Sequence, residues 1–477
     1  MDLSSVTNEY LVVTLLVGLV LIFMNSFFFT RDNSKCTVAP SSFIENIVKL
    51  AGNQCPFFLL DMMRKVKCDI FKLKMMSILG GDWYVVADID AVRTFLLDKN
   101  SEKPSQVYKP LSQVAGGDSL ATLGNKHPDW HKARKGLSPA FSSSEVRRMN
   151  NVCKVCLESW IEERLEPLIE SKQTFDPADE MTYLTFKIIM SSAFEYDNPT
   201  REEYKHYQEC IKLTAIEFDF ENPFRVWFGL FIPSRRRAFK AQREMRAFCE
   251  KILHHYRNNP NKSENNTVIN LIDKLDLTDH RKISEMVILV LAGHDTTGYQ
   301  LASTLILLSK HPQEAEKLKN DICSAQMANE SKVPGTGSEY LKHVIQESHR
   351  LVPTVATGVF RLTAKELVFK KGQVVIPQNS IVFCPFLLIG RNEEYFDEPD
   401  EFKPSRWENP TQEMTKAVIP FAIGIRNCMG QRLATAELNC ALAILMSKYK
   451  FELVDEGKMD FFLTLKYAGA KLRATRV

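Results

Sequence analysis

The stretch from Pro420 to Gly430 reads PFAIGIRNCMG and carries one cysteine, Cys428. A helical pattern follows it from Gln431 to Lys448, so we expect Cys428 to lie just before a helix. The free N–H groups and the dipole of a helix N-terminus stabilise a thiolate at that place. Gly424 and Gly430 permit tight turns and the close approach of a flat group.

The chemistry of this loop follows from what accompanies the thiol. Arg426 lies two residues before Cys428, where a guanidinium can pair with a carboxylate of a bound ligand. One thiolate without a second nearby Cys or His does not make a zinc or iron–sulfur site. A single axial thiolate on a haem iron fits the pattern. The alternative is a buried cysteine in an ordinary turn.

The loop resembles the haem-binding loop of the cytochrome P450 family, whose pattern is F-x-x-G-x-R-x-C-x-G. All five specified positions are filled here, by Phe421, Gly424, Arg426, Cys428 and Gly430. The resemblance implies a haem b (iron protoporphyrin IX) cofactor held by these five residues. It makes Cys428 the iron ligand and packs Phe421 near the sulfur on the proximal side.

A second motif, Glu347-Ser348-His349-Arg350, matches the family's E-x-x-R. Glu and Arg three residues apart share a helix face and can pair. The segment from Phe402 to Trp407 resembles the family's F-x-P-x-R-F element, with Trp407 in place of the usual Phe. The resemblance implies a buried network of Glu347, Arg350 and Arg406 with a structural role.

A third motif, residues 292–297 (AGHDTT), lies within a long apolar helical pattern. It matches the family's A/G-G-x-D/E-T-T, which places small Ala292 beside the cofactor and leaves room for dioxygen. The Thr296 hydroxyl can bond back to the carbonyl of Ala292, four residues earlier. Asp295 and Thr296 then form an acid–alcohol pair that relays protons. His294 receives no role, because a histidine within a helix is more often structural.

A fourth motif, Trp130 to Arg134, matches the family's W-x-x-x-R on a helix before the core. Trp and Arg four residues apart share a helix face. By resemblance both contact a haem propionate. Arg361 is a third candidate for that contact.

The first part of the chain predicts a membrane anchor. Residues 10–30 carry no charge, and about 20 such residues span a bilayer as a helix. A cleaved signal peptide is the alternative, but the start is acidic and the apolar run is long. Eight Lys or Arg against four acids between Arg31 and Lys74 favour the cytoplasmic side for the body of the protein. Phenylalanines between residues 218 and 231 are expected to touch the bilayer and admit substrate.

These features predict one lumenal stretch (1–9), a transmembrane anchor (10–30), a linker (31–50) and a catalytic domain (51–477). We expect a mainly α fold with small β-sheets, because residues 130–325 carry mostly helical patterns and the β-type runs are short. The resemblance implies that this is the cytochrome P450 fold, preceded by the transmembrane helix. The helical patterns cover Val146–Leu168, Arg235–Tyr256 and Ile283–Lys310, and the β-type runs cover Trp83–Ala87, Leu367–Lys370, Val374–Ile376 and Ile381–Cys384. The resemblance to microsomal members implies a single-pass protein of the endoplasmic reticulum membrane.

Composition excludes other classes of function. The net charge is +3, with 25% charged and 45% hydrophobic residues, which excludes a disordered chain and a polytopic membrane protein. Nucleic acid is not expected as the main partner, because phosphate neutralisation needs a clear basic excess. Eleven cysteines are too few for a secreted disulfide scaffold.

The resemblance implies a haem-thiolate monooxygenase that inserts one oxygen atom from O2 into a C–H bond of a lipophilic substrate. Sterols, terpenoids, fatty acids and xenobiotics all fit an apolar pocket. No G-x-G-x-x-G follows a strand, so NADPH electrons are expected through NADPH–cytochrome P450 reductase, with cytochrome b5 as a second donor. A basic docking face is predicted from Lys132, Lys135, Arg147, Arg148 and Arg432.

Two other functions stay open at this point. One is a haem-thiolate isomerase or dehydratase that rearranges peroxides without a reductase. The intact pair of Asp295 and Thr296 speaks against it. The other is a haem-binding membrane protein without enzymatic activity.

Overall fold

The computed structural model describes residues 35–75, 81–218, 233–328 and 337–477. The predicted anchor (10–30) and the phenylalanines between 219 and 231 lie outside these residues. Among the described helices, none combines the length and apolarity needed to cross a bilayer.

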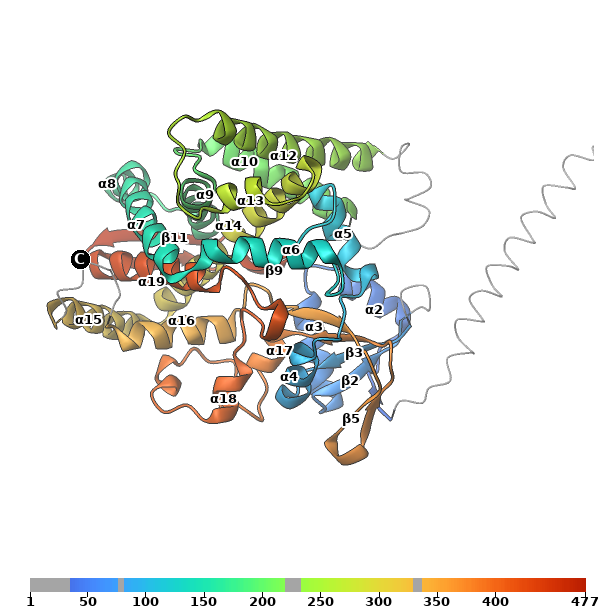
Figure 1. Ribbon diagram of the computed structural model, residues 1–477. Helices are drawn as coiled ribbons and strands as arrows, with labels where there is room; N and C mark the ends of the chain where they lie inside the picture. Colours follow the sequence, from blue (N-terminus) through green and yellow to red (C-terminus); the bar gives the residue numbers. More distant parts are fainter. Residues whose placement is uncertain (1–34, 76–80, 219–232, 329–336) are drawn as a thin grey trace, which may run out of the picture.

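The longest helix, α14 (Asp279–Lys310), forms the centre of the helical part of the molecule (Figure 1). Its N-cap is Thr278, whose hydroxyl accepts a hydrogen bond from the Arg281 N–H. Most of its side chains are buried, including polar and charged ones such as Glu285, Asp295 and Gln300. It packs against α9 (Pro177–Phe194), which is equally buried.

The prediction of a mainly helical fold is confirmed. The predicted helices at 146–168, 235–256 and 283–310 all lie within observed helical segments, the first of which includes a π-helical turn at Ile161–Leu165. The other helices are α2 (Phe43–Leu50), α3 (Cys55–Val66), α4 (Ile89–Leu97), α5 (Ser105–Ala115), α6 (Pro128–Leu137), α7 (Ser143–Trp160), α8 (Glu166–Glu170), α10 (Arg201–Phe218), α12 (Pro233–Asn258), α13 (Val268–Lys274), α15 (Pro312–Ala328), α16 (Glu339–Leu351), α17 (Phe386–Gly390), α18 (Gln412–Ala417) and α19 (Gln431–Lys448).

The small predicted sheets are also confirmed. One five-stranded sheet has the order β1 (Thr37–Val38), β2 (Ile70–Leu73), β3 (Trp83–Val86), β7 (Ile381–Cys384) and β4 (Val359–Leu362). In its centre β3 pairs in parallel with β7, so that Trp83 lies opposite Ile381. Three two-stranded ladders pair β5 (Leu367–Phe369) with β6 (Val374–Ile376), β8 (Tyr449–Asp455) with β11 (Lys471–Arg476), and β9 (Lys458–Phe461) with β10 (Leu465–Ala468).

The segment predicted as a linker, residues 31–50, contains regular structure where it is described. Strand β1 pairs in parallel with β2, and the Ala39 N–H donates to the Lys72 carbonyl. In α2, Asn46 and Leu50 are buried, and the Asn46 amide donates to the Lys74 carbonyl. The folded part of the chain therefore includes residues before 51.

Helix α19 begins and ends where the sequence predicts, and it carries a buried acid, Glu437. Burial, together with the nearby Cys440 thiol, raises the pKa of the Glu437 carboxyl from its ordinary 4.5 to about 8. The folded protein therefore holds a proton there that the unfolded chain releases above about pH 4.5. This contribution to stability is complete at low pH and is lost as the pH rises towards 8.

We predict that Glu437→Gln stabilises the protein increasingly as the pH rises from about 5 to about 8. The amide cannot ionise, and each unit of pKa difference corresponds to about 1.4 kcal/mol. Thermal unfolding of both proteins across this pH range measures the effect. Glu413→Gln, which changes an exposed acid on α18, serves as the control and should leave the pH profile of the wild type unchanged. A gain that is the same at every pH would contradict the prediction.

Candidate functional site

The Cys428 loop is fixed by its own backbone and by one glycine. The Cys428 N–H donates to the Phe421 carbonyl at 2.9 Å, and the Asn427 N–H donates to the Gly424 carbonyl at 3.1 Å. Gly424 has a φ of +79°, and a Cβ at this position would lie 2.2 Å from the Leu96 carbonyl oxygen. Only glycine allows the loop to take this path against α4.

The Cys428 thiol is accessible to solvent although it lies deep in the protein. Burial raises its pKa, while the N–H groups of Gly430 and Gln431 and the Arg134 guanidinium favour the thiolate. The predicted helix-terminus effect is therefore present, but burial outweighs it. A bound metal ion would reverse the balance, because a coordinating thiol is deprotonated.

The backbone beside this sulfur is uncrowded at Gly430. A Cβ added to Gly430 would meet only the Cys428 Sγ within 4 Å, at 3.8 Å. The surroundings of Gly430 are thus open on the side of the thiol. A solvent-accessible thiol next to uncrowded backbone fits a thiolate-ligated planar group such as a haem, which Cys428 would hold.

Trp130 and Arg134 from α6 both reach the Cys428 loop, but through different partners. Arg134 Nη1 donates to the Asn427 carbonyl at 2.9 Å, and Nη2 donates to the Asn427 side chain. Trp130 is buried, and the Arg426 guanidinium lies over its ring at 3.9 Å from the ring centre. Both residues of the W-x-x-x-R motif therefore contact the Cys428 loop, Arg134 through Asn427 and Trp130 through Arg426.

Arg426 is engaged by the protein itself. Its Nη1 donates to the Leu120 carbonyl at 3.1 Å, its Nη2 donates to the Leu123 carbonyl, and its Nε donates to the Asn125 side chain. The sequence predicts a ligand carboxylate as its partner, whereas its described partners are these three oxygens. Arg426 consequently ties the segment between α5 and α6 to the Cys428 loop.

Positive charge is concentrated next to this loop. Burial and the nearby Arg361 and Arg426 guanidinium groups hold the pKa of Lys103 well below its usual range. Burial, followed by the charge of Arg361, lowers the pKa of Arg426 to about 10. Glu102 is the acid that most offsets this charge at Arg426. The Arg361 and Arg426 guanidinium groups, which stay protonated in proteins, suit an anionic ligand, and the two carboxylates of a haem meet that requirement.

On α14 the Thr296 hydroxyl donates to the Ala292 carbonyl at 2.8 Å, which is the bond that the sequence predicts. Ala292 is exposed although the helix around it is largely buried, so this face of α14 borders open space. Thr354 adds a hydrogen bond to the Thr296 carbonyl at 3.2 Å. Helix α14 also packs against α19, which directly follows the Cys428 loop.

Asp295 is buried and held by Gln208, a side chain that the sequence did not single out. Gln208 on α10 donates to its Oδ1 at 2.7 Å, and His294 Nε2 lies 3.1 Å from the same oxygen. His294 Nδ1 lies 2.6 Å from the Val290 carbonyl and must donate to it. In neutral His294 the Nε2 is therefore an acceptor, and Gln208 bridges it to Asp295. His294 thus acts on the acid through the Gln208 amide.

Asp295 also lines a cavity of about 440 Å³. Tyr204 and Tyr299 contribute buried walls, while Lys205 and Glu209 belong to the exposed surface of α10. The carboxyl therefore borders a recess that is reached from the surface, and Thr296 is not among the residues that line it.

The second predicted cluster is a fully buried ionic network. Arg350 donates to both oxygens of Glu347 at 2.8 Å, and Arg406 donates to Oε1 at 2.9 Å. Trp407 Nε1 donates to Oε2 at 2.9 Å. Burial alone raises the pKa of Glu347, but Arg350, Arg406 and the Lys403 N–H lower it overall. The carboxylate is thus kept ionised out of water.

This network is joined to the thiol loop through His349, which lies between Glu347 and Arg350 in the chain. The His349 ring meets the Phe421 ring edge-on at 5.5 Å, and burial lowers the pKa of His349 to about 4. The Phe421 carbonyl accepts the Cys428 N–H, so α16 packs, through His349, against the loop that carries the sulfur.

Two groups of predicted residues emerge. One surrounds the thiol loop and comprises Trp130, Arg134, Arg361, Phe421, Gly424, Arg426, Cys428 and Gly430. The other lies on α14 and comprises Ala292, Asp295 and Thr296. Arg361 is buried on β4, and its Nη1 donates to its neighbour's carbonyl at 2.8 Å. Sequence reasoning missed Gln208 and Asn427. Of these two, only Asn427 could have been found from the sequence, because it lies within the loop motif next to Cys428.

Comparisons with known proteins agree with this geometry. The family model for cytochrome P450 matches residues 38–471. The chain is 29% identical over 374 residues to cytochrome P450 3A40 of Oryzias latipes, covering 70% of each chain. It is 25% identical to probable cytochrome P450 508C1 of Dictyostelium discoideum, covering 84% of this chain and 85% of the relative. A crystal structure of a cytochrome P450, CYP102L1, aligns with a TM-score of 0.75 at 21% identity, covering 93% of this chain and 99% of that one.

Proposed function

This chain belongs to the cytochrome P450 family and is a haem-thiolate monooxygenase, and we propose that it oxidises a lipophilic substrate with NADPH electrons from a reductase. The observation that carries the proposal is the thiol loop. It presents a solvent-accessible Cys428 thiol beside the uncrowded Gly430 backbone, with the Arg426 guanidinium in the same loop and Arg361 close to Arg426. This arrangement suits a thiolate-ligated haem.

We assign the residues that hold the cofactor from their places around the thiol. Cys428 is the iron ligand, and Gly430 leaves room for the macrocycle. Arg361, Arg134 and Trp130 lie on the cationic side, where they serve the propionates. When bound, a thiolate-ligated haem supplies the activation of dioxygen that the side chains lack.

The residues of α14 handle protons in this proposal. Asp295 takes a proton from solvent through the cavity that it shares with Lys205 and Glu209. Gln208 fixes its Oδ1, which leaves Oδ2 free to carry the proton. Thr296, held to the Ala292 carbonyl, presents its hydroxyl on the exposed face of the helix. A peroxide isomerase needs no such proton path.

The substrate class rests on apolar surface near this path. Phe461, Phe462 and Leu463 line the cavity beside Asp295, and the last two are exposed. Apolar groups that remain accessible next to a polar recess suit a lipophilic molecule with few polar groups. Sterols, terpenoids, fatty acids and xenobiotics all meet this description.

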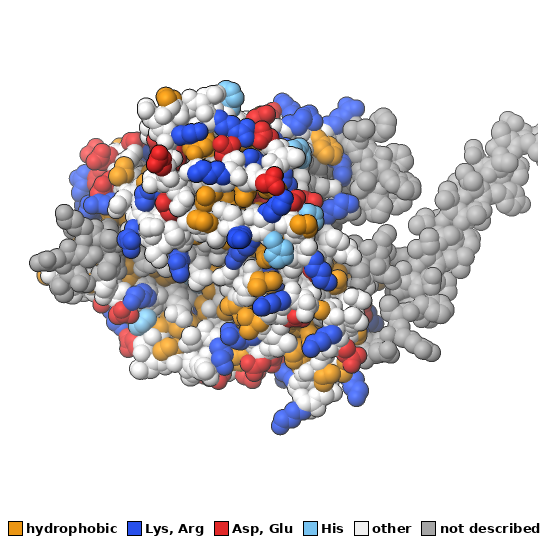
Figure 2. Space-filling view, viewed as in Figure 1, with side chains coloured by type: hydrophobic (Ala, Val, Ile, Leu, Met, Phe, Trp, Pro, Cys, Tyr) orange, Lys and Arg blue, Asp and Glu red, His pale blue; other side chains and the backbone are white. Residues whose placement is uncertain are grey.

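The proposed electron donor is NADPH–cytochrome P450 reductase, with cytochrome b5 as a second donor. Lys132, Lys135, Arg147 and Arg432 are exposed on α6, α7 and α19, around the thiol loop. Figure 2 shows Lys and Arg side chains across the middle of the face that carries α6, with acidic ones mainly towards its edges. Arg148, also expected here, is occupied by Glu145 and the Ser192 carbonyl.

We further propose a single-pass location in the endoplasmic reticulum membrane, with the catalytic domain facing the cytosol. The support is the uncharged run at 10–30 and the basic flank after it. An anchored chain should stay in the membrane pellet after alkaline extraction.

We predict that Cys428→Ala abolishes the thiolate-type band of the reduced carbon monoxide complex, because no thiolate remains to bind the iron. Difference spectra of the purified proteins check this. Cys323→Ala, which changes a partly exposed cysteine on α15, should keep the band. A thiolate-type band in Cys428→Ala would exclude the central assignment.

Asp295→Asn should lower substrate turnover by about 10²-fold, since positioned acid–base groups typically contribute 10²- to 10⁴-fold. The carbon monoxide spectrum should stay unchanged, and the solvent isotope effect on turnover should rise. Asp460→Asn, an acid lining the same cavity, is the matched control. Wild-type turnover in Asp295→Asn would remove the acid from the mechanism.

Lys135→Glu combined with Arg432→Glu should slow reduction by the reductase and make the rate less sensitive to salt, because charge steering is screened by ions. Stopped-flow reduction and NADPH-dependent oxygen consumption at several ionic strengths measure this. Lys371→Glu, on the turn between β5 and β6, is the control. Product formation without NADPH and reductase would instead support the peroxide isomerase.

A further inference from the structure

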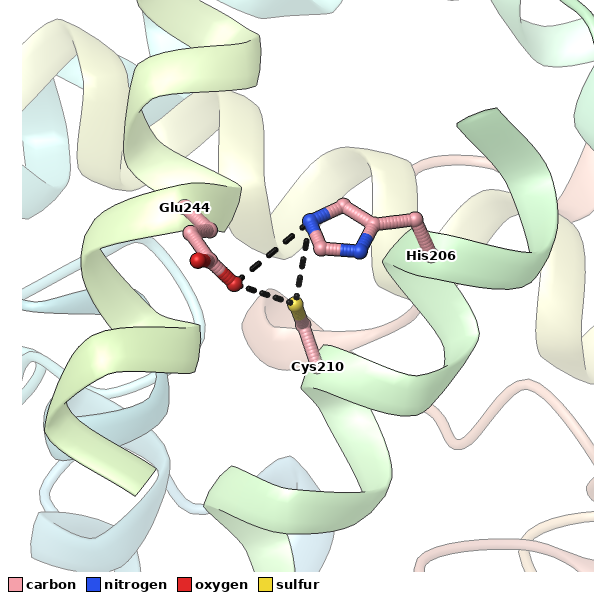
Figure 3. Close-up of side chains that lie close together, drawn as sticks. All are labelled: His206, Cys210 and Glu244. Carbon is pink, nitrogen blue, oxygen red and sulfur yellow. Dashed lines mark hydrogen bonds and ion pairs between the residues drawn. The ribbon is translucent and has the colours of Figure 1, made fainter. Parts of the chain in front are cut away.

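A mixed set of three donor groups lies between α10 and α12, away from the thiol loop (Figure 3). His206 and Cys210 are four residues apart on α10, so both point from the same face of that helix. Glu244 projects towards them from α12. The imidazole, thiol and carboxylate converge on one point.

The spacing of the three donor atoms is that of a coordination shell. His206 Nε2 lies 3.5 Å from Glu244 Oε2, and Cys210 Sγ lies 3.8 Å from Nε2 and 3.7 Å from Oε2. In a tetrahedral zinc site with bonds of about 2.3 Å to sulfur and about 2.1 Å to nitrogen and oxygen, the corresponding edges are about 3.4–3.6 Å. The edge between nitrogen and oxygen lies within this range, and the two edges to sulfur exceed it by 0.1–0.2 Å. Closure around an ion needs only small side-chain shifts.

We propose that His206, Cys210 and Glu244 bind a zinc ion that joins α10 to α12. Nitrogen, sulfur and carboxylate oxygen are the three donor types that zinc accepts, and water completes the tetrahedron. Magnesium and calcium prefer all-oxygen shells, so this donor set disfavours them. The proposal does not rest on the monooxygenase function.

Accessibility favours the uptake of an ion from solvent. The side chains of His206 and Glu244 are 61% and 34% exposed, whereas Cys210 is buried beneath them. A metal can thus arrive through the two outer ligands and reach the sulfur. Lys240 lies 3.5 Å from Glu244 Oε1 and competes with a cation for this carboxylate.

The position of the site gives it a structural consequence. Helices α10 and α12 pack along each other, and the chain between them passes through residues 219–232. A zinc ion adds a direct link between the two helices. Because α10 also carries Gln208, which bonds to Asp295, the ion would fix the helix that positions the α14 acid.

Zinc binding by the haem-loaded full-length protein tests the proposal, measured by equilibrium dialysis with metal analysis after removal of bound metals. The wild type should take up one zinc ion at this site. His206→Gln and Cys210→Ser should each weaken binding by more than about tenfold, the lower end of the loss seen when even an outer-shell partner of a metal ligand is removed. His254→Gln changes an exposed histidine of α12 outside the cluster and should bind as the wild type does. Lys240→Met should bind several-fold more tightly, since it frees the carboxylate.

Zinc K-edge X-ray absorption gives a readout that surface histidines cannot mimic. The wild type should show one sulfur ligand at about 2.3 Å, and Cys210→Ser should lose it. Since His206 is exposed, His206→Gln tests the site even if the buried variant fails to fold. No zinc uptake, equal affinity in the wild type and His206→Gln, or a shell without sulfur in the wild type would each overturn the proposal.

Discussion

A carboxylate removed from water dictates much of this structure. Glu347 and Arg350 are entirely buried, and an unpaired charge at that depth would cost several kcal/mol. The carboxylate therefore needs every donor that it receives, from the side chains of Arg350, Arg406 and Trp407 and from the Lys403 N–H. Arg350 in turn donates to the carbonyls of Gly390, Pro399 and Glu401, so it fixes a long irregular segment that no regular ladder holds. This irregular segment is held in place because three of its carbonyl groups accept hydrogen bonds from the buried, charged Arg350 side chain.

A short series of contacts connects the Glu347 network to the Cys428 sulfur. His349 shares its helix with the ionic network and presses on Phe421, whose carbonyl accepts the Cys428 N–H. From the other side, Gly424 rests against the Leu96 carbonyl, where any side chain would collide. Arg426, within the loop, stacks on Trp130 of α6, which gives the loop a third contact. A single thiol becomes a well-placed ligand because three parts of the chain restrict one loop.

The periodicity of the sequence was enough to predict the helices, strands and hydrogen bonds that depend only on neighbouring residues. The bounds of α19, β6 and β7 agree with the predicted ranges, and the bond from Thr296 to Ala292 follows from helical spacing alone. The partners of Arg426 did not follow, because stacking on Trp130 depends on how two distant segments pack. Gln208 lies 87 residues from Asp295, and no spacing rule connects them. The segment 31–50 was assigned to a linker because a two-residue strand is too short to leave a pattern.

Helix α10 shows how one element can serve two sites. Successive residues of a helix turn by about 100°, so Gln208 points almost opposite to His206, while Cys210 returns close to the direction of His206. One side of α10 therefore contacts the α14 acid, and the other contacts α12 through the donor cluster. A helix moves as a rigid body, and the amide–carboxylate bond at 2.7 Å tolerates little displacement. A displacement of α10 would therefore strain the bond between Gln208 and Asp295, although neither His206 nor Cys210 lies near the thiol loop in sequence.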